Sequence, residues 1–244
     1  MTRVAIIAAM PGELKPLTRG WQHECRSGVD LWRWAYPDEK GNKGEWIAAC
    51  AGAGTAAATR AFAEVERGGA IDRVISTGWV GALRKDLAPG QACDVSAVID
   101  ARTGERFVVA GPSDHCWLVT SPKVADTHEK LRLAETYEAS LVDMEAAGIA
   151  RLAATRGIPF YCIKGISDGY TDQLPNFNRF ISPDGRFRLA RFIVFALLRP
   201  WHWPALVRMG ENSKKAAQNI AESLLDILDE QGQIRRLNGY PNQR

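Results

Sequence analysis

The stretch SLVDMEAAGIARLAATRGIPFYCIKGISDG, residues 140–169, decides the fold class. Its pattern predicts a short apolar strand before Asp143, a helix that begins at Glu145 and ends at Gly157, and a second strand over residues 158–166. The second strand is rich in apolar and β-branched residues, as is typical of strands buried on both faces of a parallel sheet. A strand, a helix and a strand in this order predict an α/β fold.

Three acids stand at the ends of these elements: Asp143, Glu145 and Asp168. In open α/β sheets ligands bind beyond the carboxyl ends of the strands, so these side chains can converge on one crevice. Each acid taken alone is more simply explained as a solvated carboxylate at a helix start or in a loop. Their shared position predicts a site for a small ligand.

Four motifs resemble those of the nucleoside phosphorylase and nucleosidase superfamily, which includes the methylthioadenosine/S-adenosylhomocysteine nucleosidases. VDMEA at residues 142–146 and ISD at 166–168 resemble its paired signatures. VAIIAAMPGE at 4–13 resembles its first strand with the following acid, and ISTGWVGAL at 75–83 its central glycine-rich loop. The chain departs from those nucleosidases at Asp143, where they have Glu, and at Trp79, where a small residue is usual.

The resemblance implies a single-domain, three-layer α/β/α fold with a central mixed, largely parallel twisted sheet. We assign residues 1–230 to this domain and residues 231–244 to a polar C-terminal tail. The implied activity is cleavage of the N-glycosidic bond of a purine nucleoside with release of adenine. A homodimer is the superfamily's usual assembly.

The resemblance also implies roles for individual residues. Asp168, supported by Ser167, donates a proton to purine N7, and Glu13 positions the attacking water. Asp168 can act as an acid only if burial favours its protonated form, which the apolar strand before it supports. The expected substrate-binding residues are Glu145 at the ribose hydroxyls, Met144 against the sugar, and Asp143, Gly78, Trp79 and Gly54.

The nucleophile is either water or phosphate. Phosphorolysis requires a cradle for a dianion, usually glycines with arginine, and the local cations are Arg84 and Lys85, without a second arginine motif after the first strand. Glu13 would repel phosphate. We therefore favour hydrolysis without a cofactor; in the alternative, a phosphorolytic nucleoside phosphorylase, phosphate is a co-substrate.

Two alternatives come from other protein classes. AGAGTAA, residues 51–57, fits a G-x-G-x-x-A pattern and would suit an NAD-dependent oxidoreductase with a Rossmann fold. That signal is weak, because the strand over residues 73–77 has no terminal acid for a ribose hydroxyl. The glycines are then explained by close backbone approach, to a helix or to the ligand. The other alternative is a nucleoside-binding protein without turnover.

Composition limits the partners. The net charge is +3, with no dense block of Lys or Arg, so nucleic-acid binding is not expected. The four histidines show no metal-ligand spacing, so no metal site is expected. No signal peptide and no apolar run of about 18 residues is present, so we expect a cytoplasmic protein.

The C-terminal part interleaves aromatic and basic residues over 177–203. We expect helices at 189–198 and 213–230, and core or subunit packing for the aromatic residues, with contact to a membrane surface or to an apolar ligand tail as the alternatives. Pro183–Arg186, followed by LRP at 198–200, is similar to the hopanoid-associated phosphorylase branch of the superfamily. That similarity implies a lipid-linked nucleoside, adenosylhopane, as substrate.

Elsewhere we expect a hairpin of residues 29–36 and 45–50, and a helix at 55–67. We also expect one strand running from 74 into the glycine loop, and a helix from Ser121 to about Tyr137 with Pro122 at its first position.

Overall fold

The central strand of the molecule, β12 (Phe160–Asp168), is buried at every residue. The computed structural model describes residues 2–37, 43–111, 116–173 and 175–227. Within these ranges the sheet has the order β2-β3-β4-β1-β5-β12-β6-β11-β10-β8-β9, with β7 also paired to β12. The expected tail, residues 231–244, and most of the loop between β3 and β4 lie outside the described residues.

The other strands are β1 (Arg3–Ala8), β2 (Gln22–Arg26), β3 (Val29–Pro37), β4 (Lys43–Cys50), β5 (Arg73–Ser76), β6 (Trp79–Ala82), β7 (Ala92–Asp94), β8 (Ala97–Asp100), β9 (Arg106–Val108), β10 (Trp117–Thr120) and β11 (Leu141–Asp143). The helices are α1 (Pro11–Leu14), α2 (Thr55–Arg67), α3 (Thr127–Tyr137), α4 (Ala146–Arg156), η1 (Phe177–Phe180), α5 (Leu189–Leu197), η2 (Pro200–His202) and α6 (Trp203–Ile227).

The sheet is mixed and mostly parallel at its centre. Strand β12 runs parallel to β5 through residues 160–162 and parallel to β6 through residues 165–168. The antiparallel pairs are β2 with β3, β3 with β4, β6 with β11, β7 with β12 and β8 with β9. The expected α/β fold with helices on both faces of a largely parallel sheet is confirmed.

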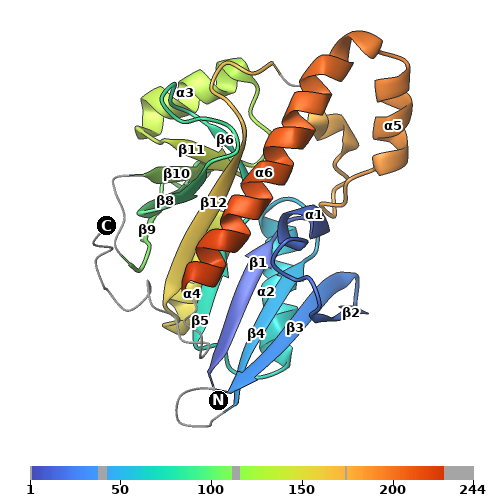
Figure 1. Ribbon diagram of the computed structural model, residues 1–244. Coiled ribbons are helices and arrows are strands. Elements are labelled where there is room, and N and C mark those ends of the chain that lie inside the picture. The colour runs from blue at the N-terminus through green and yellow to red at the C-terminus, as the bar shows by residue number, and fades with distance from the viewer. Residues whose placement is uncertain (1, 38–42, 112–115, 174, 228–244) are drawn as a thin grey trace.

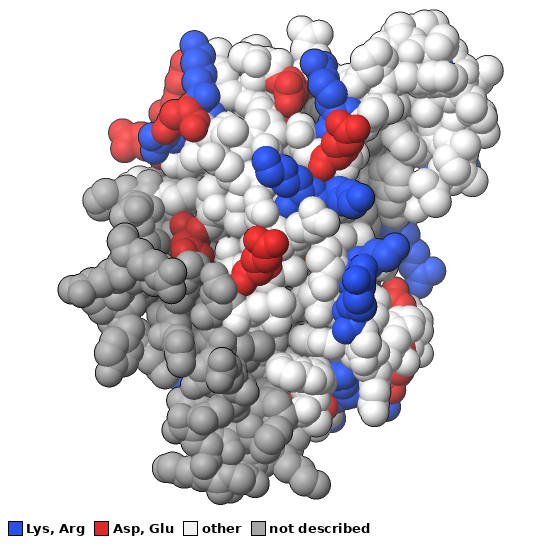
Figure 2. All heavy atoms as spheres, in the orientation of Figure 1, with Lys and Arg blue, Asp and Glu red and all other residues white. Residues whose placement is uncertain are grey.

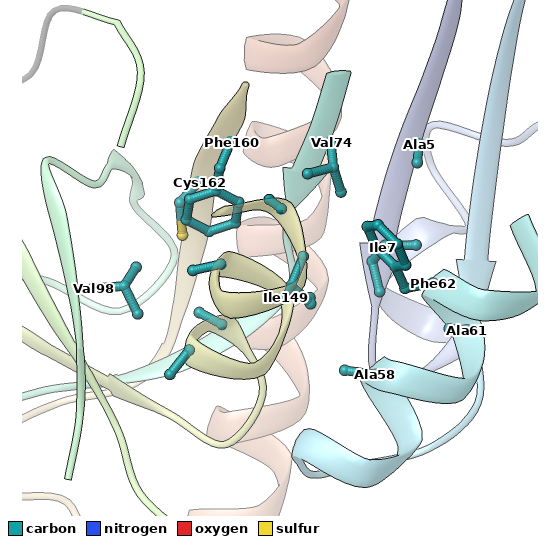
Figure 3. Close-up of a cluster of buried hydrophobic side chains, with 14 of the residues drawn as sticks. Ala5, Ile7, Ala58, Ala61, Phe62, Val74, Val98, Ile149, Phe160 and Cys162 are labelled. Carbon is teal, nitrogen blue, oxygen red and sulfur yellow. The ribbon is translucent and has the colours of Figure 1, made fainter. Parts of the chain in front are cut away.

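The side chains of β1 alternate between the two faces of the sheet. Ala5 and Ile7 pack in the cluster with Phe62 of α2 and Ile149 of α4, while Val4 and Ile6 face the cluster that contains Ile220 of α6. Successive side chains of a strand point to opposite faces, so one apolar run supplies both cores. Figure 3 shows α2 and α4 packed over the first of these faces, and Figure 1 shows α6 crossing β12 on the other.

The bounds of two expected elements before residue 140 were wrong. Helix α3 begins at Thr127 rather than after Ser121, because Asp126 caps it by accepting a hydrogen bond from the Glu129 amide at 2.9 Å. The expected strand from residue 74 into the glycine loop is split into β5 and β6 around Gly78, whose φ is +125°. Residues 79–82 therefore form a strand of the sheet rather than a loop.

Helix α6 also begins ten residues earlier than the expected start at 213, at Trp203. Its N-terminal turns, with α5 and η2, form an arm that projects beyond the sheet (Figure 1). We call residues 185–210 the helical arm. No helix among the described residues meets the length and hydrophobicity that crossing a membrane requires.

Candidate active site

A cavity of about 800 Å³ lies at the carboxyl ends of the central strands. Four acids from separate parts of the chain line it: Glu13 of α1, Asp143 at the end of β11, Glu145 at the start of α4, and Asp168 at the end of β12. All four are buried, with exposures between 4% and 8%. The structure therefore brings the predicted acids together around one space large enough for a small molecule.

Glu13 is held by three backbone amides. Its Oε2 accepts hydrogen bonds from the amides of Ala9, at 2.8 Å, and Met10, at 2.7 Å, and its Oε1 accepts one from Trp79, at 2.8 Å. Burial raises the pKa of Glu13, and the three amides and Lys164 oppose this rise. A carboxylate whose pKa is raised toward neutrality is a stronger base than an exposed one.

Asp168 is held from both sides. Ser167 Oγ donates to its Oδ1 at 2.6 Å, as the sequence interpretation required. Its Oδ2 forms an ion pair with the ammonium group of Lys130, which also donates to the Gly169 carbonyl at 2.6 Å. Lys130 is 1% exposed and was not expected at the site. The ammonium group of Lys130 therefore compensates the charge of the Asp168 carboxylate at a buried position.

Glu145 begins helix α4 and faces the cavity. Its Oε1 accepts a hydrogen bond from the Gly54 amide at 2.6 Å, and its Oε2 accepts one from the Met144 amide at 3.1 Å. Burial and the nearby Asp143 raise the pKa of Glu145 to about 8. Met144 also lines the cavity, as expected for a residue that packs on a sugar.

Asp143 lines the cavity, but its oxygens are occupied within the chain. It accepts hydrogen bonds from Thr120 Oγ1 at 2.7 Å and from the Ala146 amide at 3.0 Å, and it pairs with Lys164 Nζ at 2.9 Å. Burial acts to lower the pKa of Lys164, but Asp143, Cys162 and Glu145 together outweigh this effect and the pKa is raised. Asp143 thus fixes the start of α4 and a buried lysine.

Two glycines of the predicted loop make room for the carboxylates. A Cβ at Gly78 would lie 2.8 Å from Glu13 Oε1, and a Cβ at Gly81 would lie 3.1 Å from Asp168 Oδ2. Three residues of extended chain span about 10 Å. Glu13 and Asp168 therefore flank the two ends of β6, with space between them for a ligand.

The remaining predicted residues, Gly54 and Trp79, have structural contacts of their own. The Gly54 amide holds Glu145, and Gly52 lies so close to Gly185 that a Cβ would meet its carbonyl oxygen at 2.5 Å. The glycines of residues 51–57 thus serve close approach within the chain. Trp79 lines the cavity and donates from its indole Nε1 to the Ser213 carbonyl at 2.9 Å, which joins β6 to α6.

One part of the cavity lining, which we call the apolar wall, consists of apolar side chains. It includes Phe177 and Phe187, Phe192 of α5, and Leu206 and Met209 of α6. The cluster of aromatic rings around Phe180 is continuous with this wall, with ring centroids 5.1 to 6.5 Å apart. The cavity therefore has two parts: a polar floor, formed by the four acids and the lysines that pair with them, and the apolar wall.

The cations expected for phosphate lie elsewhere. Arg84 does not line the cavity and pairs with the exposed Asp86 at 2.6 Å. Lys15, Arg19, Lys123 and Lys214 line the cavity together with the acids. The described residues contain no group of three or more His, Cys, Asp or Glu that could hold a metal ion.

A sequence model of the family described as the Phosphorylase superfamily matches residues 3–123 and 118–196. The chain belongs to the Phosphorylase superfamily. The Rossmann oxidoreductase alternative is thereby excluded. No curated protein sequence matches the chain.

Solved structures of this superfamily share the fold. A 5′-methylthioadenosine/S-adenosylhomocysteine nucleosidase from Helicobacter pylori superposes with a TM-score of 0.70 at 17% identity, covering 94% of this chain and 99% of that one. Futalosine hydrolase from Helicobacter pylori gives 0.70 at 16% identity, covering 94% and 98%. The 5′-methylthioadenosine nucleosidase from Arabidopsis thaliana gives 0.68 at 16% identity, covering 98% and 99%.

Proposed function

We propose that this protein hydrolyses the N-glycosidic bond of a purine nucleoside and releases adenine. The observation that carries the proposal is the convergence of Glu13, Glu145 and Asp168 on one cavity, with Glu13 and Asp168 at opposite ends of β6. The superfamily and the nucleosidases that share the fold support the same reaction class. Departure of a purine needs a proton for the base on one side of the sugar and a nucleophile on the other.

Each step of the proposed hydrolysis is assigned to a residue. Glu13 takes a proton from a water whose oxygen attacks C1′ of the ribose. The C1′–N9 bond breaks and its electron pair goes to the adenine, which takes a proton at N7 from Asp168. That proton comes from the ammonium group of Lys130 and passes through the Asp168 carboxylate, which leaves Lys130 neutral, and Ser167 fixes the orientation of the carboxyl group. The carboxylate of Glu145 accepts hydrogen bonds from ribose hydroxyls and stabilises the positive charge that develops on the sugar.

Water is favoured over phosphate by the position of Glu13. The amides of Ala9, Met10 and Trp79 point at one place, as in an anion-binding nest, and the carboxylate of Glu13 already fills that place. A phosphate dianion would have to displace a negative group that the chain itself supplies.

The apolar wall favours a nucleoside with an apolar 5′ substituent. Phe192, Leu206 and Met209 offer contacts to a hydrocarbon but no hydrogen bonds from their side chains. Ser213 Oγ, buried at the same wall, has no hydrogen-bond partner within the described chain, and a ligand can use it. Adenosylhopane, which the similarity to the hopanoid-associated branch implies, is such a substrate, and we propose it as the candidate to test first.

The test is adenine release from adenosylhopane, adenosine and 5′-alkylthioadenosines by the purified protein, in buffers with and without phosphate. We expect release without phosphate, and a loss of about a hundredfold or more in Glu13→Gln. Release only with phosphate, with ribose 1-phosphate as product, would show the phosphorolytic alternative to be right. Binding of the nucleosides without any release would show a protein without turnover.

A further inference from the structure

The helical arm, residues 185–210, exposes an unusual number of large apolar side chains. Of the twelve exposed large hydrophobic residues in the described chain, eight belong to this arm. They are Leu189, Ile193, Val194, Leu197, Leu198, Trp201, Trp203 and Val207, with exposures between 47% and 68%. Helix α5 has no buried residue at all. A cluster of this kind marks an interaction surface, because it costs free energy to leave in water.

The helical arm carries basic side chains but no acidic ones. Residues 185–210 contain five arginines and no Asp or Glu. The structure gives no ion pair to Arg188, Arg191 or Arg208 within the described residues. In Figure 2 the arm is seen at upper right as an almost uncharged surface without any acid. A partner that offers both apolar contact and negative charge would complement this surface.

We infer that the helical arm docks on the surface of an anionic lipid bilayer. Exposed aliphatic side chains enter the boundary between headgroups and acyl chains, tryptophans lie at the same level, and arginines pair with phosphate headgroups. Helix α5 has nine residues, too few to span the hydrocarbon core, so the arm lies in the surface of the bilayer. This inference does not depend on the reaction proposed above.

A second copy of the chain fits this surface less well. In a two-fold contact the same patch meets itself, so ten arginines would gather at the contact while residues 185–210 of the two copies supply no acid. An anionic bilayer removes that repulsion and satisfies the same apolar side chains.

The arm also forms part of the cavity wall. Phe192 of α5 and Leu206 of α6 line the cavity, while their neighbours Ile193 and Val207 are exposed. A docked arm would therefore place a lipid surface against the outer side of the elements whose inner side contacts the ligand.

The experiment is flotation of the full-length protein with vesicles of equal parts phosphatidylglycerol and phosphatidylcholine, compared with phosphatidylcholine alone. We expect binding to the anionic vesicles only, weakened by salt. Leu197→Glu/Leu198→Glu should lose binding at least tenfold, whereas Val108→Glu, an 88% exposed apolar position on β9, should bind as wild type does. Arg191→Ala and Arg208→Ala should each lose about fivefold, and Arg102→Ala nothing.

Further measurements distinguish docking on a bilayer from misfolding of the variant and from a subunit interface. Far-ultraviolet circular dichroism and cleavage of a soluble nucleoside check that the Leu197→Glu/Leu198→Glu variant is folded, because neither residue lines the cavity. Absence of binding to anionic vesicles, or equal binding by this variant and by Val108→Glu, would overturn the proposal. So would a wild-type dimer in lipid-free buffer that this variant dissociates, since the patch would then be a subunit interface.

Discussion

The floor of the cavity and the helical arm differ in almost every physical respect. The floor consists of buried acids and lysines, and four of these groups form two ion pairs, Asp168 with Lys130 and Asp143 with Lys164. The arm consists of exposed apolar residues and arginines on helices outside the sheet. Buried ion pairs tolerate little displacement, whereas apolar contacts accept many shapes.

This difference suits the floor and the arm to different tasks. The floor can fix the reaction because the sheet holds its groups in one geometry. The arm can select what is attached to the nucleoside, because contacts of helices outside the sheet change without moving the acids. Changes in the floor should thus affect turnover and stability, and changes in the arm should affect substrate choice.

The largest expected effect is that of Asp168→Asn. An amide cannot pass a proton to the leaving base, so kcat should fall about a thousandfold. Binding should persist, measured as a ligand-induced rise in Tm. The control is Asp86→Asn, which changes an exposed carboxylate of the surface. Turnover within tenfold of wild type in Asp168→Asn would assign the acid role elsewhere.

Lys130→Met should destabilise the fold strongly. The methionine fills the space of the lysine but leaves the Asp168 carboxylate buried without its partner, which costs about 3–5 kcal/mol in the free energy of unfolding. Urea denaturation measures this cost. Lys123→Met, an exposed lysine just before α3, should cost little.

The double variant Lys130→Met/Asp168→Asn is the sharper measurement. It removes both charges, so it should be more stable than Lys130→Met alone. Equal stabilities of the single and the double variant would mean that the ion pair contributes nothing to the floor.

The pH dependence should report Glu145. Below pH 8 its carboxyl group is largely protonated, so it accepts weaker hydrogen bonds from ribose hydroxyls and no longer stabilises positive charge on the sugar, and kcat/KM should rise up to tenfold per pH unit toward about 8. The Glu145→Gln variant should lose this part of the profile, whereas Glu135→Gln, an exposed position on α3, should keep it. Identical profiles for Glu145→Gln and wild type would refute the assignment.

The same group predicts a trend in stability. Its pKa is raised in the folded protein from 4.5 to about 8, so folding is favoured below pH 4.5 and this contribution is lost as the pH rises through 8. Glu145→Gln should therefore have a higher Tm than wild type at pH 9 and a similar Tm at pH 4.

The smallest effect is expected in the arm. Phe192→Ala should raise KM about tenfold for adenosines with an alkyl 5′ substituent and leave adenosine unaffected, because only the substituent reaches the apolar wall. Phe195→Ala is the matched control, since Phe195 belongs to the same ring cluster but does not line the cavity. Equal effects of Phe192→Ala on both substrates would contradict the division between floor and arm.

The sequence was sufficient for the architecture and the acids. The apolar run of residues 158–166, with Gly157 before it, predicted β12 and the end of α4, and Gly157 is indeed in the left-handed conformation that ends a helix, with φ of +64°. Local signals place the acids at the ends of elements, and the structure brings them around one cavity, while the roles that the family resemblance implies for them stay predictions.

The two buried lysines were missed for a different reason. Lys164 interrupts an apolar strand, which is a signal for a buried ion pair, because an unpaired charge cannot stay there. Lys130 gave little signal, since it lies on an amphipathic helix among other charged residues. Its partner is 38 residues away in sequence, and only the packing of α3 on the sheet brings them together. Helix α6 was expected too short because Pro204 and Gly210 weaken the helical pattern at its start.

The three amides that converge on Glu13 bear on how water-using and phosphate-using proteins of one lineage can be related. A shorter neutral residue at position 13 would leave a vacant, electropositive pocket of backbone amides at the place of the attacking group. Water-using and phosphate-using members of such a lineage need not differ in their scaffold, because replacement of one side chain exchanges a resident anion for a dissolved one.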